Sequence, residues 1–144
     1  MSQKISLKGR ALRYLAGREH SRAELERKLA PHEEEPGQIR RILDELQAKD
    51  FINEERVIES VIHRRAARFG AARIKQELAG KGLAPEAVAQ AMAGLNSTEL
   101  ERAQEVWSRK FGGQVPAEAK ERARQMRFLT ARGFSPEVVR RVVR

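Results

Sequence analysis

The sequence predicts an all-α protein in which three tandem three-helix repeats form an elongated, curved array. Apolar residues recur at helical spacing along the 144-residue chain, and no segment alternates as a half-buried strand would. Residues that cap or break helices fall between these periodic segments and separate about nine short helices. The segments also form an internal repeat, and tandem units of this kind stack end to end, so that each unit touches only its neighbours.

The first repeat is predicted over residues 1–52. Its first helix carries an apolar residue at every fourth position, at Leu7, Ala11 and Leu15. The second helix begins at a capping box formed by Ser21 and Glu24. An acidic loop over residues 31–37 leads to the third helix, whose apolar stripe comprises Ile39, Ile42, Leu43 and Leu46.

The second and third repeats are predicted over residues 53–96 and 97–144. Asn53 is followed by two glutamates, the pattern of an N-cap with an acidic first turn. Asn96 or Ser97 is predicted to cap a further helix, which would begin the third repeat. The chain ends on a short helix that carries Val138, Val139, Val142 and Val143.

Two short stretches share one frame: LAGKGLAPEAV from residue 78 and LTARGFSPEVV from residue 129. Gly82 and Gly133 each follow the end of a helix, where the backbone turns left-handed and glycine costs least. The apolar residue after each glycine is expected to fold back onto the leucine that opens the stretch. The proline then stands at the first position of the next helix, where its missing N–H is no loss. Both stretches are therefore predicted to be joints that stop one helix and start another, rather than catalytic loops.

The chain is strongly basic, with 29 Lys and Arg against 20 Asp and Glu and a formal net charge of +9. This charge points to an anionic partner, either nucleic acid or an acidic protein assembly. Cysteine is absent, which fits a reducing compartment. No apolar run reaches the roughly 20 residues that span a bilayer, and residues 1–10 lack the apolar core of a secretory signal. We therefore expect a cytoplasmic protein without a membrane partner.

Basic residues cluster once in each repeat, and the cluster over residues 63–75 contains no acid. A helix C-terminus attracts cations and explains part of this cluster, but not Arg73 and Lys75 at the start of the next helix. We expect a positive surface that follows an extended anionic partner. The candidate contact residues are Arg10, Arg13, Arg64, Arg65, Arg68, Arg73, Lys75, Arg124, Arg127 and Arg132.

Aromatic residues make up 5% of the chain and are not interleaved with the basic ones in the sequence. No platform for stacking single-stranded bases is therefore expected. Four aromatic residues at helix ends or on apolar stripes are assigned to the apolar core, namely Phe51, Phe69, Trp107 and Phe111. Glu77 and Lys81 are spaced as an ion pair on a solvated helix face.

The sequence contains no Walker loop, dinucleotide fingerprint, zinc-protease motif or serine-hydrolase elbow. The three histidines, His20, His32 and His63, lack the spacing of metal ligands. We therefore expect a protein that is not an enzyme and has no catalytic residue, metal or cofactor.

Three stretches resemble the RecX regulatory protein family: ALRYLAGREHSRAELERKL from Ala11, FINEERVIESVIHRRAARFGAARIKQELAGKGL from Phe51 and MRFLTARGFSPEVVRRVV from Met126. The resemblance covers nearly the whole chain and implies tandem three-helix repeats. It also implies a function, because members of this family bind the RecA recombinase filament, lodge in its helical groove and suppress recombinase and ATPase activity. The family acts in DNA repair, recombination and the SOS response by blocking filament extension or promoting disassembly. One departure is Ala71, where the family often has proline.

The resemblance and the charge together predict a monomer that binds the RecA filament and, weakly and electrostatically, single- or double-stranded DNA. Two other functions stay open. Basic three-helix units also describe helix-turn-helix transcription regulators, although the tandem repeats and the absence of an obvious recognition helix disfavour this class. The chain would otherwise be a plain helical scaffold whose charge serves solubility.

Overall fold

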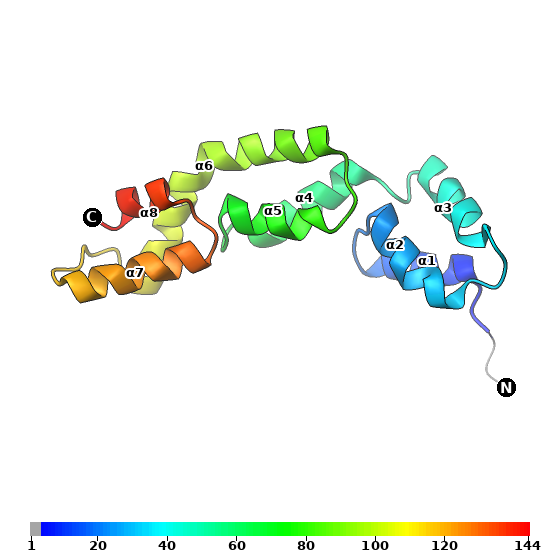
Figure 1. The fold of residues 1–144 in the computed structure, drawn as a ribbon, viewed down its shortest axis with the longest axis horizontal. Coiled ribbons are helices and arrows are strands. Elements are labelled where there is room, and N and C mark those ends of the chain that lie inside the picture. The colour runs from blue at the N-terminus through cyan, green and yellow to red at the C-terminus, as the bar shows by residue number, and fades with distance from the viewer. Residues whose placement is uncertain (1–3) are drawn as a thin grey trace.

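The computed structural model describes residues 4–144, which form an arch of helices without a strand (Figure 1). The first three helices are α1 (Leu7–Gly17), α2 (Arg22–Leu29) and α3 (Gln38–Ala48), with a 3₁₀ turn at Ala30–His32 after α2. The chain continues through α4 (Glu54–Arg65), α5 (Ala71–Ala79), α6 (Pro85–Phe111), α7 (Ala119–Ala131) and α8 (Pro136–Val142). The predicted all-α array is confirmed; residues 1–3 of the predicted first repeat lie outside the described residues.

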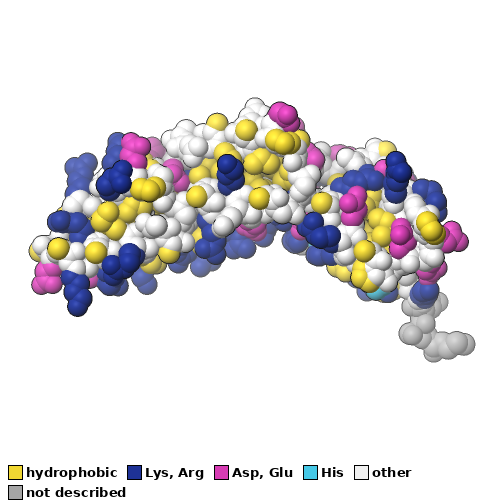
Figure 2. Space-filling model, viewed as in Figure 1, with side chains coloured by type: hydrophobic (Ala, Val, Ile, Leu, Met, Phe, Trp, Pro, Cys, Tyr) yellow, Lys and Arg dark blue, Asp and Glu magenta, His cyan; other side chains and the backbone are white. Residues whose placement is uncertain are grey.

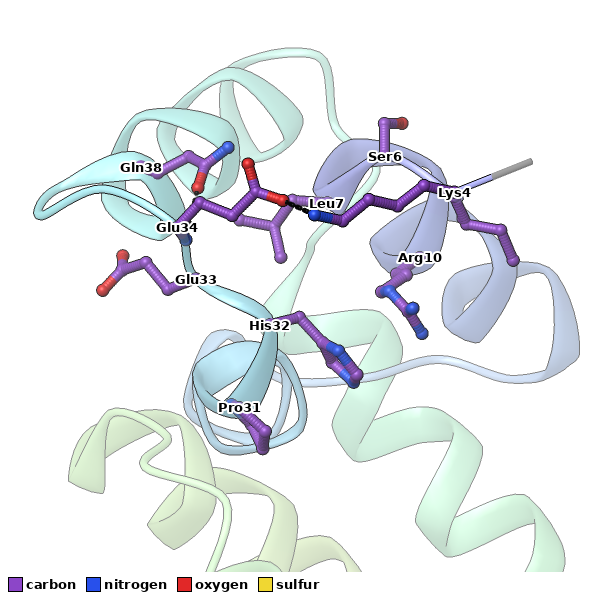
Figure 3. A pocket seen from close by; sticks show the side chains of 10 residues that line it. Lys4, Ser6, Leu7, Arg10, Pro31, His32, Glu33, Glu34 and Gln38 are labelled. Carbon is purple, nitrogen blue, oxygen red and sulfur yellow. Dashed lines mark hydrogen bonds and ion pairs between the residues drawn. The ribbon is translucent and has the colours of Figure 1, made fainter. Parts of the chain in front are cut away.

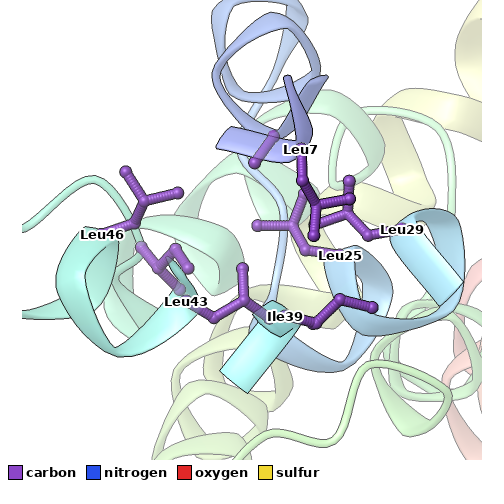
Figure 4. Close-up of a cluster of buried hydrophobic side chains, with 8 residues drawn as sticks. Leu7, Leu25, Leu29, Ile39, Leu43 and Leu46 are labelled. Atoms are coloured by element: carbon purple, nitrogen blue, oxygen red, sulfur yellow. The ribbon is translucent and has the colours of Figure 1, made fainter. Parts of the chain in front are cut away.

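The apolar core is divided into three clusters, and each cluster belongs to one group of three helical segments. Leucines and isoleucines of α1, α2 and α3 meet in the first cluster, which includes Leu25 and Leu43 (Figure 4). A second cluster joins α4, α5 and the first half of α6, and a third joins the second half of α6 to α7 and α8. Each group of helices therefore buries its own apolar faces, as a tandem repeat requires.

The helix starts that the sequence predicts are confirmed at three places. Ser21 accepts a hydrogen bond from the Glu24 amide, and the Glu24 carboxylate accepts one from the Ser21 amide, which completes the capping box. Asn53 caps α4 through the Arg56 amide, and Ser135 caps α8 through the Val138 amide. Each cap satisfies an N–H group that has no partner within its helix.

The helix start predicted at Asn96 or Ser97 is wrong, because α6 runs unbroken through both residues. No proline interrupts this segment. Ser97 donates to the Gly94 carbonyl at 2.7 Å and Thr98 to the Leu95 carbonyl at 3.3 Å, so these side chains bond back into the helix instead of capping a new one. Such bonds bend helices, and α6 changes direction about halfway along (Figure 1). The described residues thus form eight α-helices, one of them shared by two repeats; the predicted repeat boundaries stay a prediction.

The stretch around Gly133 is a helix joint, as predicted. The Phe134 amide donates to the Leu129 carbonyl at 3.3 Å and the Gly133 amide to the Thr130 carbonyl at 3.0 Å, the two bonds of a Schellman ending. Gly133 has a φ of 91° and Gly82 a φ of 64°, so both glycines take the left-handed backbone.

The joint at Gly133 also fastens the third repeat to the second. α5 begins at Ala71, and its N-cap residue, Gly70, has no side chain that could cap it. The carbonyl oxygens of Arg132 and Gly133 accept hydrogen bonds from the Gly70 and Ala72 amides at 2.7 and 3.3 Å. The Ala71 amide donates to the buried Glu99 carboxylate at 2.7 Å, a bond that proline at this position would not permit. Backbone and carboxylate oxygens from α6 and the joint therefore replace the missing cap.

The joint at Gly82 lies against the first repeat in the same way, at the start of α2. A Cβ atom on Gly82 would lie 2.9 Å from the Ala23 Cβ atom. Lys81 is 8% exposed, and its Nζ atom lies 3.0 Å from Glu24 Oε1. Arg18 Nη2 lies 2.8 Å from the other Glu24 oxygen. The prediction that Lys81 pairs with Glu77 on a solvated face is therefore wrong, because Lys81 is buried at the contact between repeats.

The contact between the first two repeats is expected to weaken in acid, because it depends on the ionised carboxylate of Glu24. Burial raises the pKa of this carboxyl, but hydrogen bonds from Arg18, the Ser21 amide and Lys81 outweigh it and bring the pKa to about 2. Because the pKa of Glu24 is lower in the folded than in the unfolded state, its ionised carboxylate stabilises the fold at any pH above the unfolded-state pKa. This stabilisation is lost as the pH falls towards 2. We expect Glu24→Gln to remove up to about 3 kcal/mol of unfolding free energy at pH 7 and to flatten its decline in acid.

Urea unfolding between pH 7 and pH 2 measures this effect. Glu26→Gln is the matched control, because Glu26 is on the same helix and its ion pair, with Arg22, is exposed to solvent. Such a pair contributes less than about 1 kcal/mol. Superimposable pH curves for wild type and Glu24→Gln would show that the buried pair does not stabilise the fold.

Candidate functional site

Basic and aromatic side chains gather where the second and third repeats meet. The guanidinium Cζ atoms of Arg65, Arg73 and Arg132 lie 5.7, 5.0 and 5.2 Å from the centre of the Phe69 ring. Arg65 ends α4, Arg73 is in the first turn of α5 and Arg132 follows α7, so three elements supply one cluster. The ring holds three like charges together through cation–π attraction.

Arg132 extends this cluster into the third repeat. Its Cζ atom lies 5.1 Å from the centre of the Phe128 ring, and Lys110 Nζ lies 5.4 Å from the same ring. Phe128 meets Phe111 edge to face with ring centres 5.3 Å apart, and Arg124 covers Phe111 at 5.2 Å. We call this continuous set of seven Arg and Lys residues and three Phe residues the basic ridge: Arg65, Arg68, Arg73, Arg109, Lys110, Arg124, Arg132, Phe69, Phe111 and Phe128.

Aromatic and basic residues are separate in the sequence but interleave in the fold, because the joint at Gly133 brings Arg132 over Phe69 of the preceding repeat. The assignment of Phe51 to the core is wrong, since it is 47% exposed. Trp107 is in the core as predicted and donates to Gln125 at 2.7 Å.

Two hollows in the surface open along the basic ridge. One has a volume of about 310 Å³ and is lined by Arg68, Val106, Arg109, Lys110, Phe128 and Arg132, with no acid among them. The other, of about 380 Å³, lies beside Arg65, Phe69 and Arg73 and contains one acid, Glu77. Glu77 lies 3.1 Å from Arg65 and 3.9 Å from Arg64 and partly neutralises that end. The strongest positive potential is therefore expected at the first hollow.

Buried polar contacts hold the loop between α4 and α5 in place beneath the ridge. Arg102 of α6 donates to the carbonyls of Ala66, Phe69 and Leu95 at 3.0, 2.8 and 3.0 Å. Burial lowers the pKa of this guanidinium, which is still charged at neutral pH. The position of Phe69 at the centre of the ridge is therefore fixed by α6.

The structure brings together only some of the predicted contact residues. Arg65, Arg68, Arg73, Arg124 and Arg132 belong to the ridge, and Arg64 is beside it through Glu77. Among the described residues, Arg13, Lys75 and Arg127 are exposed but take no part in the cation–π contacts and line neither hollow.

Arg10 is in the first repeat, at the other end of the arch. It lines a hollow of about 470 Å³ together with His32, Glu33 and an ion pair between Lys4 and Glu34 (Figure 3). Charges of both signs meet there, so this hollow does not continue the positive surface.

Sequence reasoning missed Arg109, Lys110 and Phe128. The first two are in the last turn of α6, a position that favours cations at any helix end and therefore carries no functional signal in sequence. Only the packing of the third repeat against the second shows that they face Arg68 and Arg132.

The arrangement is suited to binding anions. Arginine is charged at any physiological pH and offers paired donors to phosphate or carboxylate groups. The aromatic rings lie beneath these cationic groups and hold them side by side. Among residues 4–144, no group of three or more His, Asp or Glu side chains is placed to hold a metal ion, and no helix is long and apolar enough to cross a membrane.

Family models match the chain in three consecutive places. The first three-helix domain of RecX matches residues 8–46, the second residues 53–92 and the third residues 97–143. "Regulatory protein RecX" of Leptothrix cholodnii is 60% identical over 140 residues, which cover 97% of this chain and 88% of that relative. "Regulatory protein RecX" of Ralstonia nicotianae is 50% identical over 141 residues, covering 98% and 88%.

Solved structures agree with the sequence matches. The crystal structure of RecX from Lactobacillus salivarius superposes with a TM-score of 0.76 at 20% identity, covering 95% of this chain and 92% of that chain. A second crystal structure, of regulatory protein RecX, gives 0.74 at 20% identity and covers 94% and 70%. These structures share the fold, and the family models with the relatives establish the family. This chain belongs to the RecX family of regulatory proteins.

Proposed function

We propose that this protein is a non-enzymatic regulator that binds the RecA–DNA filament and inhibits its recombinase and ATPase activity. Binding would limit filament growth or promote disassembly, and the protein would act as a monomer in the cytoplasm. The observation that carries this proposal is the basic ridge, which joins two repeats of a RecX-family array into one surface rich in cations, with Glu77 and Glu121 paired to its two ends.

The shape of the molecule suits a long partner. Its repeats follow one another along an arch, and Lys and Arg side chains line the lower, concave edge on the side where α5 and α7 lie (Figure 2). A groove in a nucleoprotein filament is continuous and partly anionic through its DNA, so an elongated basic array can contact several subunits at once. In this proposal, the residues that contact the RecA–DNA filament centre on Arg65, Arg68, Arg73 and Arg132. Further contacts come from Arg10, Arg13, Arg64, Lys75, Arg124 and Arg127.

Partner preference separates this function from the other two classes. We expect gel shifts at low and moderate salt to show tighter binding to RecA-coated single strands than to bare single strands or duplex, because protein contacts add to phosphate contacts. Tight, sequence-selective binding to duplex would indicate a helix-turn-helix regulator instead. No binding to any of the three would indicate a scaffold.

A further inference from the structure

A groove between α4 and α6 has a different chemistry from the basic ridge. It has a volume of about 300 Å³ and is lined by Ile58, Ile62, Ala87 and Ala91, with Gln90 beside them. Figure 2 shows apolar side chains gathered in the upper middle of the arch, where α6 and α4 lie in Figure 1. Ile58 is 5% exposed and forms the floor, whereas Ile62, Ala87 and Ala91 are half-buried with apolar surface still open to solvent.

The charge at this groove is negative, although the chain as a whole carries +9. Glu55 and Glu59 are exposed on the α4 wall, one turn apart. The ion pairs found among the described residues include neither glutamate, and no cation lines the groove. An acid in the first turn of a helix is stabilised by the helix dipole, which accounts for Glu55 but not for Glu59 in the next turn.

The basic side chains at the end of α4 are directed towards α5 and not into the groove. Glu55, Ile58, Glu59 and Ile62 are spaced by three and four residues and therefore share one face of the helix. Arg64 is half a helical turn from Ile62 and belongs to the opposite side of α4. Arg65, the ridge residue on this helix, follows Ile62 by three residues, but its side chain contacts Glu77 of α5 at 3.1 Å and the Phe69 ring at 5.7 Å and does not line the groove. The second repeat thus presents an acidic, apolar groove between α4 and α6, while the cations at the end of α4 are directed towards α5.

We propose that the α4–α6 groove binds an α-helix of another protein that carries an apolar stripe bordered by Lys or Arg. Ala87 and Ala91 are one turn apart, and their small side chains let a second helix approach α6 closely. Apolar residues at helical spacing fill grooves of this kind. Glu55 and Glu59 then pair with basic residues along one edge of the bound helix, and this complementarity sets its orientation and excludes acidic helices and nucleic acid.

Two synthetic peptides test this site without RecA or DNA, so the result is independent of the proposed function. Both are fluorescein-labelled helices with leucine at positions i, i+3, i+4 and i+7; one has lysine along the flank and the other glutamate. We expect fluorescence anisotropy to show binding of the lysine peptide to the wild-type protein and none of the glutamate peptide. The double variant Glu55→Lys with Glu59→Lys should lower the affinity for the lysine peptide at least tenfold and should bind the glutamate peptide.

Glu101→Lys with Glu105→Lys is the matched control, because these two exposed acids are also one turn apart but line a separate hollow at the other end of α6. It should change the affinity of the lysine peptide by less than twofold. Ala91→Leu, which fills the groove without a change of charge, should also weaken binding. If both double variants lowered the affinity for the lysine peptide equally, the attraction would be unspecific and the proposed site would be contradicted. Failure of the lysine peptide to bind would overturn it as well, as would self-association of the wild-type protein that Glu55→Lys with Glu59→Lys abolishes.

Discussion

Arg68→Glu combined with Arg132→Glu is expected to weaken binding to RecA-coated single-stranded DNA at least tenfold, or by roughly 1.4 kcal/mol or more. Both residues line the acid-free hollow of the basic ridge, and Arg132 contacts the rings of both Phe69 and Phe128. Reversal places two carboxylates where a phosphate or an acidic side chain would bind, so attraction becomes repulsion. The dependence of the affinity on salt should also fall, because fewer counterions are released.

Arg40→Glu combined with Arg41→Glu is the matched control for this experiment. These exposed arginines are on α3, outside the ridge, and their reversal changes the net charge by the same amount. Binding of this variant should stay within about twofold of wild type, and circular dichroism should show unchanged helicity for both variants. Equal losses for the two variants would mean that net charge, and not the ridge, determines binding.

Gly133→Ala is expected to lower the unfolding free energy by roughly 3 kcal/mol or more, a large effect for one methyl group. Gly133 has a φ of 91°, which a residue with a Cβ atom rarely adopts. The added Cβ atom would also lie 2.5 Å from Arg73 Cβ and 2.7 Å from the Arg73 amide nitrogen, and the backbone there cannot move without releasing α5. Thermal unfolding should show a midpoint lower by about 10 °C, with the third repeat unfolding first.

Gly94→Ala provides the opposite expectation in the same chain. Gly94 is inside α6 with nothing within 4 Å of an added Cβ atom, so alanine should raise the unfolding free energy by about 0.5–1 kcal/mol. If Gly133→Ala were as stable as wild type, the joint at Gly133 would not hold the second and third repeats together.

Local signals in the sequence predicted the parts of this fold that depend on local chemistry. Ser21, Asn53, Gly82 and Gly133 are where caps and left-handed turns were expected, because a cap or a turn is decided by a few neighbouring residues. The helix start expected at Asn96 or Ser97 was wrong because local residues do not decide it. A serine followed by acids is compatible with either a cap or a helix interior, and the packing of α6 against α4, α5, α7 and α8 decides between them.

The basic ridge could be predicted only in part. The sequence identified Arg65, Arg68 and Arg73 as an acid-free cluster, but it gave no sign that Phe69 would hold them or that Arg132 and Lys110 would join them. Those contacts exist because a joint that looks purely structural docks against the uncapped start of α5. The similar joint at Gly82 buries Lys81 against Glu24, so two similar motifs place their basic residues in opposite environments.

The ATPase activity of RecA on single-stranded DNA, measured with and without this protein, tests the central claim most directly. We expect the wild-type protein to suppress ATP hydrolysis in proportion to its concentration at amounts well below one molecule per RecA subunit, because the proposed binding mode has each molecule contact several subunits. Arg68→Glu with Arg132→Glu should not suppress it at the same concentration, whereas Arg40→Glu with Arg41→Glu should. An unchanged rate of ATP hydrolysis with the folded wild-type protein at saturating concentration would contradict the proposed regulation of RecA.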